Sequence, residues 1–457
     1  MGKYFGTDGF RGEAGVNLTA DHAYKVGRFL GWYYNALRER SGNNEPARIV
    51  IGKDTRRSSY MFEYSLVAGL TASGADAYLL HVTTTPSVAY IARVDDFDCG
   101  IMISASHNPF YDNGIKLIDC YGEKMPEETL LLVEDYIDGK LHVFDQDWPE
   151  LPFAHREHIG CTVDYVAGRN RYMGYLISLG IYSFKGIKVG LDCANGASWN
   201  IAKSVFDALG ADTYVINNQP NGLNINLNAG STHIEGLQKF VVEKGLDVGF
   251  AYDGDADRCL AVDERGRVVD GDQILYVCGV YLNKHGRLSG GTVVPTIASN
   301  FGLVKSLELA GLSAVTSGVG DRHVYAKMRE GGYSLGGEQT GHTIFGDIER
   351  TGDGIMTSLR VMEVIRAERE TLSQLTAPCK LLPQAQVAVR VADKDAALGN
   401  MGVQAAIAEA EASLAGEGRV LVRKSGTESV IRVLAEAPDQ ASADTAMKRI
   451  ANALEAL

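Results

Sequence analysis

Apolar and polar positions repeat in the same order at three places along the chain. An apolar run is followed by a polar loop, positions of helical period, a glycine and a second apolar run. The three stretches span residues 47–82, 187–218 and 291–318. The glycines fall where a helix C-cap needs a positive φ, and they are Gly74, Gly210 and Gly311. This order predicts parallel strands joined by a right-handed helical crossover.

A further apolar run follows each stretch and ends in a polar loop. CGIMI leads into SASHNP, VGFAY into DGDADR, and GYSLG into GEQTGH. Ligands of open α/β sheets bind beyond the carboxyl ends of the strands, where these loops fall. The pattern therefore predicts an α/β fold with three similar α/β/α domains, whose mixed, largely parallel sheets each carry a loop of functional composition.

The C-terminal part follows a different plan. QVAVRV and the two halves of RVLVRKSGTESVIRVLAEA resemble strands, and an Ala-rich helical segment capped by Gly416 lies between them. A final helix has Asp439 as a candidate N-cap, and its apolar face contains Met447, Ile450, Leu454 and Leu457. This β-α-β-β-α order predicts a small α+β domain.

Two segments that contain prolines are typical of linkers, WPELPFAHREH at 148–158 and TAPCKLLPQ at 376–384. We therefore expect four domains. They are 1–155 with SASHNP, 156–258 with DGDADR, 259–375 with GEQTGH, and 376–457 with RKSGTESVIR.

Composition narrows the possible partners. The 457-residue chain has ordinary globular composition, and its formal net charge of −13 argues against nucleic acid or an anionic membrane as a partner. Its seven cysteines include no C-x-x-C pair, which favours a reducing cytoplasm over a disulfide framework. We expect no secretory signal and no membrane span, because the sequence has no apolar h-region and no run of 18 apolar residues.

The loop AYDGDADR indicates a metal site. Asp253, Asp255 and Asp257 alternate after an apolar run, and carboxylates so close together repel one another unless a cation binds. Their hard oxygens suit Mg²⁺. An EF-hand would need Gly where Arg258 stands and helices where the flanks resemble strands. A solvated acidic turn is the other alternative, and the position at a strand end argues against it.

The segment RKSGTESVIR has the chemistry of a phosphate site. It combines cationic side chains with short hydrogen-bond donors in a tight turn. These residues are Arg423, Lys424, Ser425, Gly426, Thr427 and Arg432. Taken alone, a solvated hairpin turn explains them equally well.

Other candidate residues have equally ordinary explanations. Glu338, Thr340 and His342 in GGEQTGH could bind sugar hydroxyls, but a loop with a buried, hydrogen-bonded histidine is the better interpretation of these residues alone. Arg11 in FGTDGFRG could form a surface salt bridge. Lys116 in NGIKL could be an exposed lysine at the start of a strand.

SASHNP places a serine beside a histidine, which suggests a hydrolase. Neighbouring side chains at a strand end generally point apart, so we expect His107 to be poorly placed as a base for Ser106. The chain has no G-x-S-x-G elbow at this loop. Because a metal loop and a phosphate site occur elsewhere, the better hypothesis is a serine that carries a phosphoryl group and completes the metal shell with a phosphate oxygen.

Together these loops resemble those of the α-D-phosphohexomutase family. The resemblance covers the whole chain, and all four loops occur in family order. FGTDGFRG, ISASHNPFYDNGIK, PNGLNINLNAGSTH, VGDR, GEQTGH and RTGDG are most similar to the phosphoglucosamine mutase branch. GEQ also favours that branch over the phosphomanno/phosphoglucomutase branch, which usually has GEM. The resemblance implies three α/β domains and a TATA-binding-protein-like fourth domain around a central cleft.

The resemblance also implies roles for the candidate residues. Ser106 would be the phosphoserine, and Ser104 a structural residue at the strand end. The phosphate on Ser106 would hold one Mg²⁺ together with Asp253, Asp255 and Asp257. The residues supporting phosphoryl and proton transfer would be Arg11, His107, Lys116 and Arg258. The sugar contacts would be Glu338, Thr340 and His342, and the non-reacting phosphate would bind Arg423, Ser425, Gly426, Thr427 and Arg432.

The implied reaction interconverts glucosamine 6-phosphate and glucosamine 1-phosphate through a sugar 1,6-bisphosphate, which is also the activator. A cytoplasmic monomer or homodimer would catalyse it. The alternatives are a phosphoglucomutase or phosphomannomutase with the same mechanism, a metal phosphohydrolase, and a sugar-phosphate-binding protein without activity. Three positions depart from the family pattern, with Ser429 in place of Pro, Ala256 in place of Gly and Thr340 in place of Ser.

Overall fold

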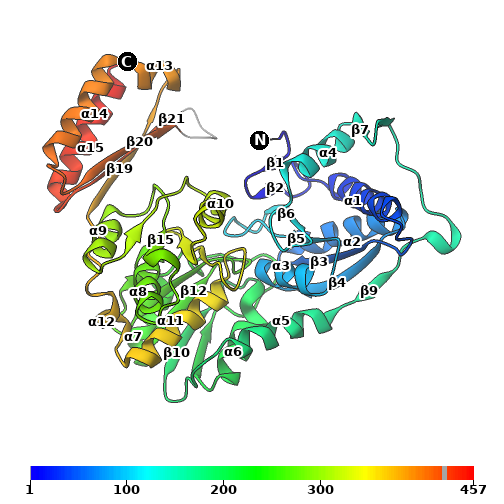
Figure 1. Ribbon diagram of the computed structural model, residues 1–457, viewed down its shortest axis with the longest axis horizontal. Helices are drawn as coiled ribbons and strands as arrows, with labels where there is room; N and C mark the ends of the chain where they lie inside the picture. Colours follow the sequence, from blue (N-terminus) through cyan, green and yellow to red (C-terminus); the bar gives the residue numbers. More distant parts are fainter. Residues whose placement is uncertain (1, 425–429) are drawn as a thin grey trace.

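The computed structural model describes residues 2–424 and 430–457 (Figure 1). Its described strands form sheets of seven, five, four and three strands, together with a two-stranded hairpin. The three largest sheets share one arrangement. The strand that opens each βαβ unit lies between two parallel neighbours, and a fourth strand pairs antiparallel with the third. The prediction of three similar α/β domains with mixed sheets is confirmed.

Domain I is drawn in blue and cyan in Figure 1, and its sheet has the order β1-β2-β6-β5-β3-β4-β9. Alternate residues of β3 face opposite sides, so Ile49 and Ile51 pack toward α1, α2 and α4, whereas Val50 packs toward α3. The elements are β1 (Phe5–Gly6), β2 (Gly9–Glu13), α1 (Ala20–Arg40), β3 (Arg48–Lys53), α2 (Arg57–Ala72), β4 (Asp76–Val82), α3 (Thr85–Val94), β5 (Cys99–Ile103), β6 (Asp112–Asp119), α4 (Glu127–Ile137), β7 (Leu141–Val143), β8 (Gln146–Trp148) and β9 (Thr162–Asp164).

Domain II has the strand order β11-β10-β12-β13-β14. Helices α5 and α6 pack on one face of this sheet, and α7 covers the other. The elements are α5 (Val166–Ser178), β10 (Lys188–Asp192), α6 (Ala202–Ala208), β11 (Asp212–Ile216), α7 (Glu235–Lys244), β12 (Val248–Tyr252), β13 (Cys259–Asp263) and β14 (Val268–Val269).

Domain III has the strand order β16-β15-β17-β18, and its helices α8, α9 and α11 share one continuous core with domain II. Helix α10 packs on the other face of the sheet. The elements are α8 (Gly271–Lys284), β15 (Thr292–Val294), α9 (Phe301–Leu309), β16 (Ser313–Ala314), α10 (Asp321–Gly331), β17 (Leu335–Gly337), β18 (Thr343–Phe345), α11 (Gly354–Glu368) and α12 (Leu372–Thr376).

Domain IV is a three-stranded antiparallel sheet, β19-β21-β20, covered by α14 and α15. The Asp439 side chain caps α15 by accepting a hydrogen bond from the Ser442 amide at 2.9 Å, as predicted. The apolar face predicted for this helix is one residue too long. Leu457 does not belong to it, because α15 ends at Glu455 and Leu457 is 62% exposed. The elements are β19 (Gln384–Arg390), α13 (Lys394–Gly399), α14 (Met401–Ser413), β20 (Arg419–Lys424), β21 (Val430–Glu436) and α15 (Gln440–Glu455).

Two of the expected domain boundaries do not coincide with the sheets. The boundary after residue 258 was wrong, because β13 and β14 continue the sheet of β12, and DGDADR is the turn of a hairpin within that sheet. The boundary after residue 155 was also too early, since β9 pairs in parallel with β4 and thus belongs to the sheet of domain I. We therefore place these two boundaries near residues 165 and 270.

Short polar contacts fix the functional loops of different domains relative to one another. The Thr85 amide donates to the Asp255 carbonyl at 3.1 Å, which joins domain I to domain II. The Cys259 amide donates to the Gly341 carbonyl at 3.0 Å, which joins the acidic hairpin to the loop of domain III. No helix within residues 2–424 and 430–457 has the length and apolar character needed to cross a membrane.

Candidate active site

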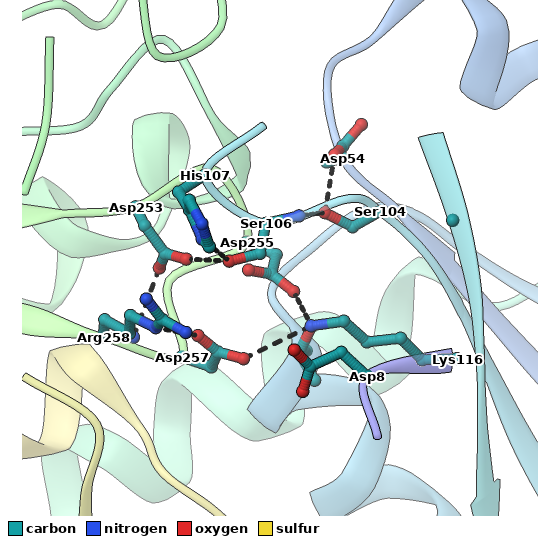
Figure 2. Close-up of polar contacts among 12 residues, drawn as sticks. Asp8, Asp54, Ser104, Ser106, His107, Lys116, Asp253, Asp255, Asp257 and Arg258 are labelled. Carbon is teal, nitrogen blue, oxygen red and sulfur yellow. Dashed lines mark hydrogen bonds and ion pairs between the residues drawn. The ribbon is translucent and has the colours of Figure 1, made fainter. Parts of the chain in front are cut away.

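The three central loops occupy equivalent positions, since each connects a parallel strand to its antiparallel partner, β5 to β6, β12 to β13 and β17 to β18. In domain I this loop follows β5 and contains Ser106, which is buried and has a left-handed φ of 51°. The Ser106 hydroxyl donates to Asp253 Oδ2 at 2.5 Å (Figure 2). The structure thus brings together two residues that lie 147 positions apart in the chain, one from each of two domains.

The two serines of SASHNP have different surroundings. Ser104 Oγ donates to Asp54 Oδ2 at 2.7 Å and accepts a hydrogen bond from the Ser106 amide at 2.9 Å (Figure 2). The Ser104 hydroxyl therefore forms its hydrogen bonds within domain I, whereas the Ser106 hydroxyl faces the acidic loop. This arrangement supports the distinction that the sequence suggested between them.

His107 lies closer to Ser106 than we expected. Its Nδ1 is 3.2 Å from Ser106 Oγ, so the expectation that the two side chains point apart was wrong. The reason is the left-handed backbone of Ser106, which ends the alternation of a regular strand. Burial, together with the charges of Arg258 and Arg11, lowers the pKa of His107 to about 4.

The acidic loop has the geometry of a cation site. One oxygen from each of Asp253, Asp255 and Asp257 lies within 4.8 Å of the other two, and all three residues are buried. Asp255 Oδ1 and Asp257 Oδ1 have no hydrogen-bond partner among the described residues. Buried carboxylate oxygens without partners are costly, and a hard divalent cation would satisfy them. These residues therefore fit the Mg²⁺ expected from the sequence.

The electrostatics of the loop lead to the same conclusion. Burial, followed by the charges of Asp257 and Asp255, raises the pKa of Asp253 to about 8. Lys116 Nζ lies 2.6 Å from Asp255 Oδ2 and 3.3 Å from Asp257 Oδ2. Burial would lower the pKa of Lys116, but the two carboxylates outweigh it and raise this pKa. Burial and the charges of Asp257 and Asp255 raise the pKa of Asp253 even though Arg258 lowers it, and a divalent cation would favour the ionised form of all three carboxylates.

The other cationic candidates also lie at this centre. Arg258 donates its amide to Asp253 Oδ1 at 3.2 Å, and its Nε is 3.9 Å from Asp257 Oδ1. Arg11, on β2, forms an ion pair with Asp8 at 3.4 Å, and its side chain is 23% exposed. The exposed-lysine interpretation of Lys116 was wrong, since its side chain is only 13% exposed.

The loop of domain III brings Glu338, Thr340 and His342 to different environments. Glu338 Oε1 accepts the Gly320 amide at 2.9 Å, and Thr340 is exposed at the tip of the loop. His342 is only 3% exposed, and its Nε2 accepts the Gly352 amide at 3.0 Å. The interpretation of a buried, hydrogen-bonded histidine thus describes His342, whose contact with a sugar remains a prediction.

The candidate phosphate site lies between domains III and IV. Arg423 and Arg432 stand opposite each other in the register of β20 and β21, an arrangement of like charges that an anion would stabilise. Both line a cavity of about 470 Å³ together with Gln339, the neighbour of Glu338. Ser425, Gly426 and Thr427, like the unusual Ser429, lie outside the described residues.

Sequence reasoning missed several residues that shape the site. Glu123 accepts hydrogen bonds from Arg329 and Arg350 of domain III at 3.2 and 3.1 Å. These residues rim a cavity of about 200 Å³ that extends to Lys116 and Asp257. Single charged residues give no pattern in the sequence, so pairing over more than 200 positions could not be predicted.

Comparison with known proteins identifies the family. Models of phosphoglucomutase/phosphomannomutase alpha/beta/alpha domains I, II and III match residues 2–142, 171–266 and 270–381. The model of the C-terminal domain of the same family matches residues 387–453. The chain therefore belongs to the phosphoglucomutase/phosphomannomutase family, and the resemblance stated from its motifs is confirmed.

Individual relatives make the position within the family clearer. A protein of Lachnospira eligens named phosphoglucosamine mutase is 62% identical over 437 residues, covering 96% of this chain and 95% of that protein. A protein of Anoxybacillus flavithermus with the same name is 47% identical over 451 residues, covering 99% of this chain and 98% of that protein.

Two solved structures share the fold. A phosphoglucomutase/phosphomannomutase family protein of Burkholderia thailandensis has a TM-score of 0.79 at 22% identity, covering 100% of this chain and 98% of that one. Aspergillus fumigatus N-acetylphosphoglucosamine mutase, solved in complex with GlcNAc-6P and magnesium, has a TM-score of 0.68 at 20% identity, covering 99% and 95%. The four-domain architecture is thus shared over the whole length.

Proposed function

We propose that this chain is a phosphohexomutase that interconverts glucosamine 6-phosphate and glucosamine 1-phosphate through phosphorylated Ser106 and a sugar 1,6-bisphosphate. The observation that carries the proposal is the 2.5 Å contact between Ser106 Oγ and Asp253 Oδ2. It joins a buried serine to a loop of three buried carboxylates. The phosphoglucosamine mutases that are 45–62% identical support glucosamine as the sugar.

The reaction consists of two phosphoryl transfers in opposite directions. In the first, the bond between phosphorus and Ser106 Oγ breaks, a bond to the free sugar oxygen forms, and the proton of that hydroxyl passes to a base, for which the neutral imidazole of His107 is the candidate. The bisphosphate then turns end over end, the bond between its other phosphorus and the sugar oxygen breaks, a bond to Ser106 Oγ forms, and the sugar oxygen takes the proton back from the same base. Mg²⁺ held by Asp253, Asp255 and Asp257 would supply charge neutralisation at the transferring group. Positioning and fixed positive charge supply most of the catalysis in such reactions.

The remaining candidates provide positioning and charge. Lys116 and Arg258 already contact the acidic loop, and we propose that with Arg11 they stabilise the transferring phosphoryl group. His107, at 3.2 Å from Ser106 Oγ, is placed to exchange the hydroxyl proton. The sugar would contact Glu338, Thr340 and His342. Its non-reacting phosphate would bind Arg423, Ser425, Gly426, Thr427 and Arg432, a site that accepts either end of the bisphosphate.

We further propose that the protein acts in the cytoplasm, with the activating bisphosphate and one Mg²⁺ per subunit. Its seven cysteines are all unpaired, and five of them are buried, which suits a reducing compartment. One chain supplies all four loops, so a monomer or a homodimer could carry a complete site.

The decisive experiment compares kcat/KM for glucosamine, glucose and mannose phosphates with Mg²⁺ and the matching bisphosphate present. We expect glucosamine phosphate to be preferred, and Ser106→Ala to lose nearly all turnover. A preference for glucose or mannose phosphate would reassign the substrate within the family. Stoichiometric release of inorganic phosphate would identify a phosphohydrolase instead, and absence of turnover on all three sugars would indicate a binding protein.

A further inference from the structure

The conformation of Ser106 is held by a residue of another domain. Asn226 lies in PNGLNINLNAGSTH, a motif to which the proposed reaction gives no role. It is only 6% exposed, and its Nδ2 donates to the carbonyl oxygens of Ser106 at 2.8 Å and of Asn108 at 3.1 Å. Because both partners are carbonyl oxygens, the amide nitrogen must face them.

Domain I holds the same two carbonyl groups through a second donor, Arg56. Arg56 is fully buried, and its Nη2 donates to the Ser106 carbonyl at 3.1 Å and to the Asn108 carbonyl at 2.6 Å. Asp54 in turn holds the Arg56 guanidinium through an ion pair. We call the SASHNP segment, residues 104–109, the serine loop. It is held by a hydrogen-bond donor of domain I and another of domain II.

These hydrogen bonds hold a part of the backbone that is strained. A left-handed φ costs a residue with a side chain about 1–2 kcal/mol, and Ser106 has a φ of 51°. The Ser106 amide is bonded to Ser104 Oγ, so the carbonyl contacts complete the fixation of this residue. A left-handed serine persists only where its surroundings impose it.

The acidic loop approaches the serine loop closely beside these hydrogen bonds. A Cβ atom on Gly254 would lie 2.4 Å from the Ser106 carbonyl oxygen and 3.0 Å from Asn226 Nδ2. The acidic loop can therefore approach the serine loop only because residue 254 is glycine. Asn226 and Asp253 both belong to domain II, so the amide that holds Ser106 is fixed in the same body as the carboxylate that Ser106 faces.

We infer that Asn226 is a positioning residue for phosphoryl transfer, which sets Ser106 Oγ against Asp253 across the junction between domains I and II. This inference rests on the proposed function. Its effect should fall on the transfer step and not on sugar binding, because the side-chain amide of Asn226 donates to carbonyl groups of the serine loop.

Three variants test this role. Asn226 has a left-handed φ of 58°, a region that Asn, Asp and Gly tolerate. Asn226→Asp keeps the size and the backbone but turns a carboxylate oxygen toward two carbonyl oxygens. Asn226→Gly keeps the backbone and removes the donor. Asn228→Asp is the matched control, since Asn228 has a φ of 48° in the same motif and is exposed.

The measurements are steady-state kinetics on glucosamine phosphate and the rate of Ser106 phosphorylation by the bisphosphate, followed by intact mass. Misplacement of a reacting group by about 1 Å costs roughly a hundredfold in rate. We expect kcat and the phosphorylation rate to fall about that much in both Asn226 variants, with KM changed less than about twofold, while Asn228→Asp matches the wild type.

Several outcomes would overturn the inference. Three are kinetic: an unchanged phosphorylation rate in folded Asn226→Gly, an effect confined to KM, and an equal loss of kcat in Asn228→Asp. The fourth is failure of both Asn226 variants to fold, which would make the residue part of the general scaffold. The proposed function is tested separately, on the wild-type protein. If wild-type Ser106 takes up no phosphate, the function fails. If it does so and the Asn226 variants match it, only the positioning role fails.

Discussion

Lys116 Nζ lies 2.6 Å from Asp255 Oδ2, although 139 residues separate them in the chain. Lys116 is on β6 of domain I, and Asp255 is in the acidic hairpin of domain II (Figure 2). The same ammonium group is 3.3 Å from Asp257 Oδ2. Domain I therefore supplies to the proposed metal site both the serine and a fixed positive charge.

Replacing this charge should impair catalysis. In Lys116→Met, Asp255 and Asp257 lose their cationic partner, and the transferring phosphoryl group loses fixed positive charge. Removal of one preorganised electrostatic group typically costs about 10²–10³-fold in kcat. Steady-state kinetics at saturating Mg²⁺ measure this effect. Lys140→Met, at a side chain that is 64% exposed, is the control and should retain wild-type kcat; equal rates in the two variants would refute the role.

The two serines of SASHNP should respond in opposite ways to substitution by alanine. Ser104→Ala leaves the buried Ser106 amide without its acceptor, so we expect stability to fall by about 1–3 kcal/mol while Ser106 still takes up phosphate. Ser106→Ala removes the donor to Asp253 Oδ2, so with Mg²⁺ present to satisfy that carboxylate it should unfold close to the wild-type denaturant midpoint and take up no phosphate. Denaturant unfolding and intact mass measure both quantities. Phosphate on Ser106→Ala would show that another residue is the acceptor.

Mg²⁺ should stabilise the fold through the acidic hairpin. A ligand present at 100 times its dissociation constant stabilises the folded state by about 2.7 kcal/mol. We expect the thermal midpoint to rise on addition of Mg²⁺ and to return with EDTA, and Asp255→Asn to lose most of this response. Asp147→Asn, at a side chain that is 87% exposed, should keep it. A full Mg²⁺ response in Asp255→Asn would place the ion elsewhere.

The repeated sheets could be predicted because each is encoded by neighbouring residues. Hydrophobic period and glycine position determine a strand–helix–strand unit locally, and the three predicted glycines have φ values of 77–88°. The loops after β5, β12 and β17 could be recognised for the same reason. The domain boundary predicted after residue 258 was wrong because the antiparallel strand CLAVD has the same apolar pattern as the first strand of a new unit.

Contacts between domains could not be predicted in this way. The hydrogen bonds of Asn226 to the serine loop span 118–120 positions, and an Asn-rich loop has the same composition whether or not it holds another domain. The left-handed backbone of Ser106, which turns His107 toward its neighbour, depends on such contacts. The family resemblance located the candidate residues, but only the structure showed that the partner of Ser104 is Asp54 and that of His342 is the Gly352 amide.

Glu349 should make stability depend on pH near neutrality. Burial raises the pKa of this carboxyl group to about 7, against the opposing effect of Arg93 at 3.1 Å. Because the folded pKa lies above the unfolded value of about 4.5, the contribution to stability is complete below pH 4.5 and is lost as the pH rises through 7. A shift of this size corresponds to a loss on the order of 3 kcal/mol above pH 7.

Glu349→Gln removes this titration and keeps the shape of the side chain. We expect the variant to gain stability relative to the wild type between pH 5 and pH 8, whatever constant offset the weakened contact with Arg93 introduces. Urea unfolding of both proteins at intervals across this range measures the difference. His142→Gln, at a histidine side chain that is 63% exposed, provides a surface control. A difference between Glu349→Gln and wild type that is constant with pH would show that Glu349 is ionised throughout the range, with the ion pair to Arg93 outweighing its burial.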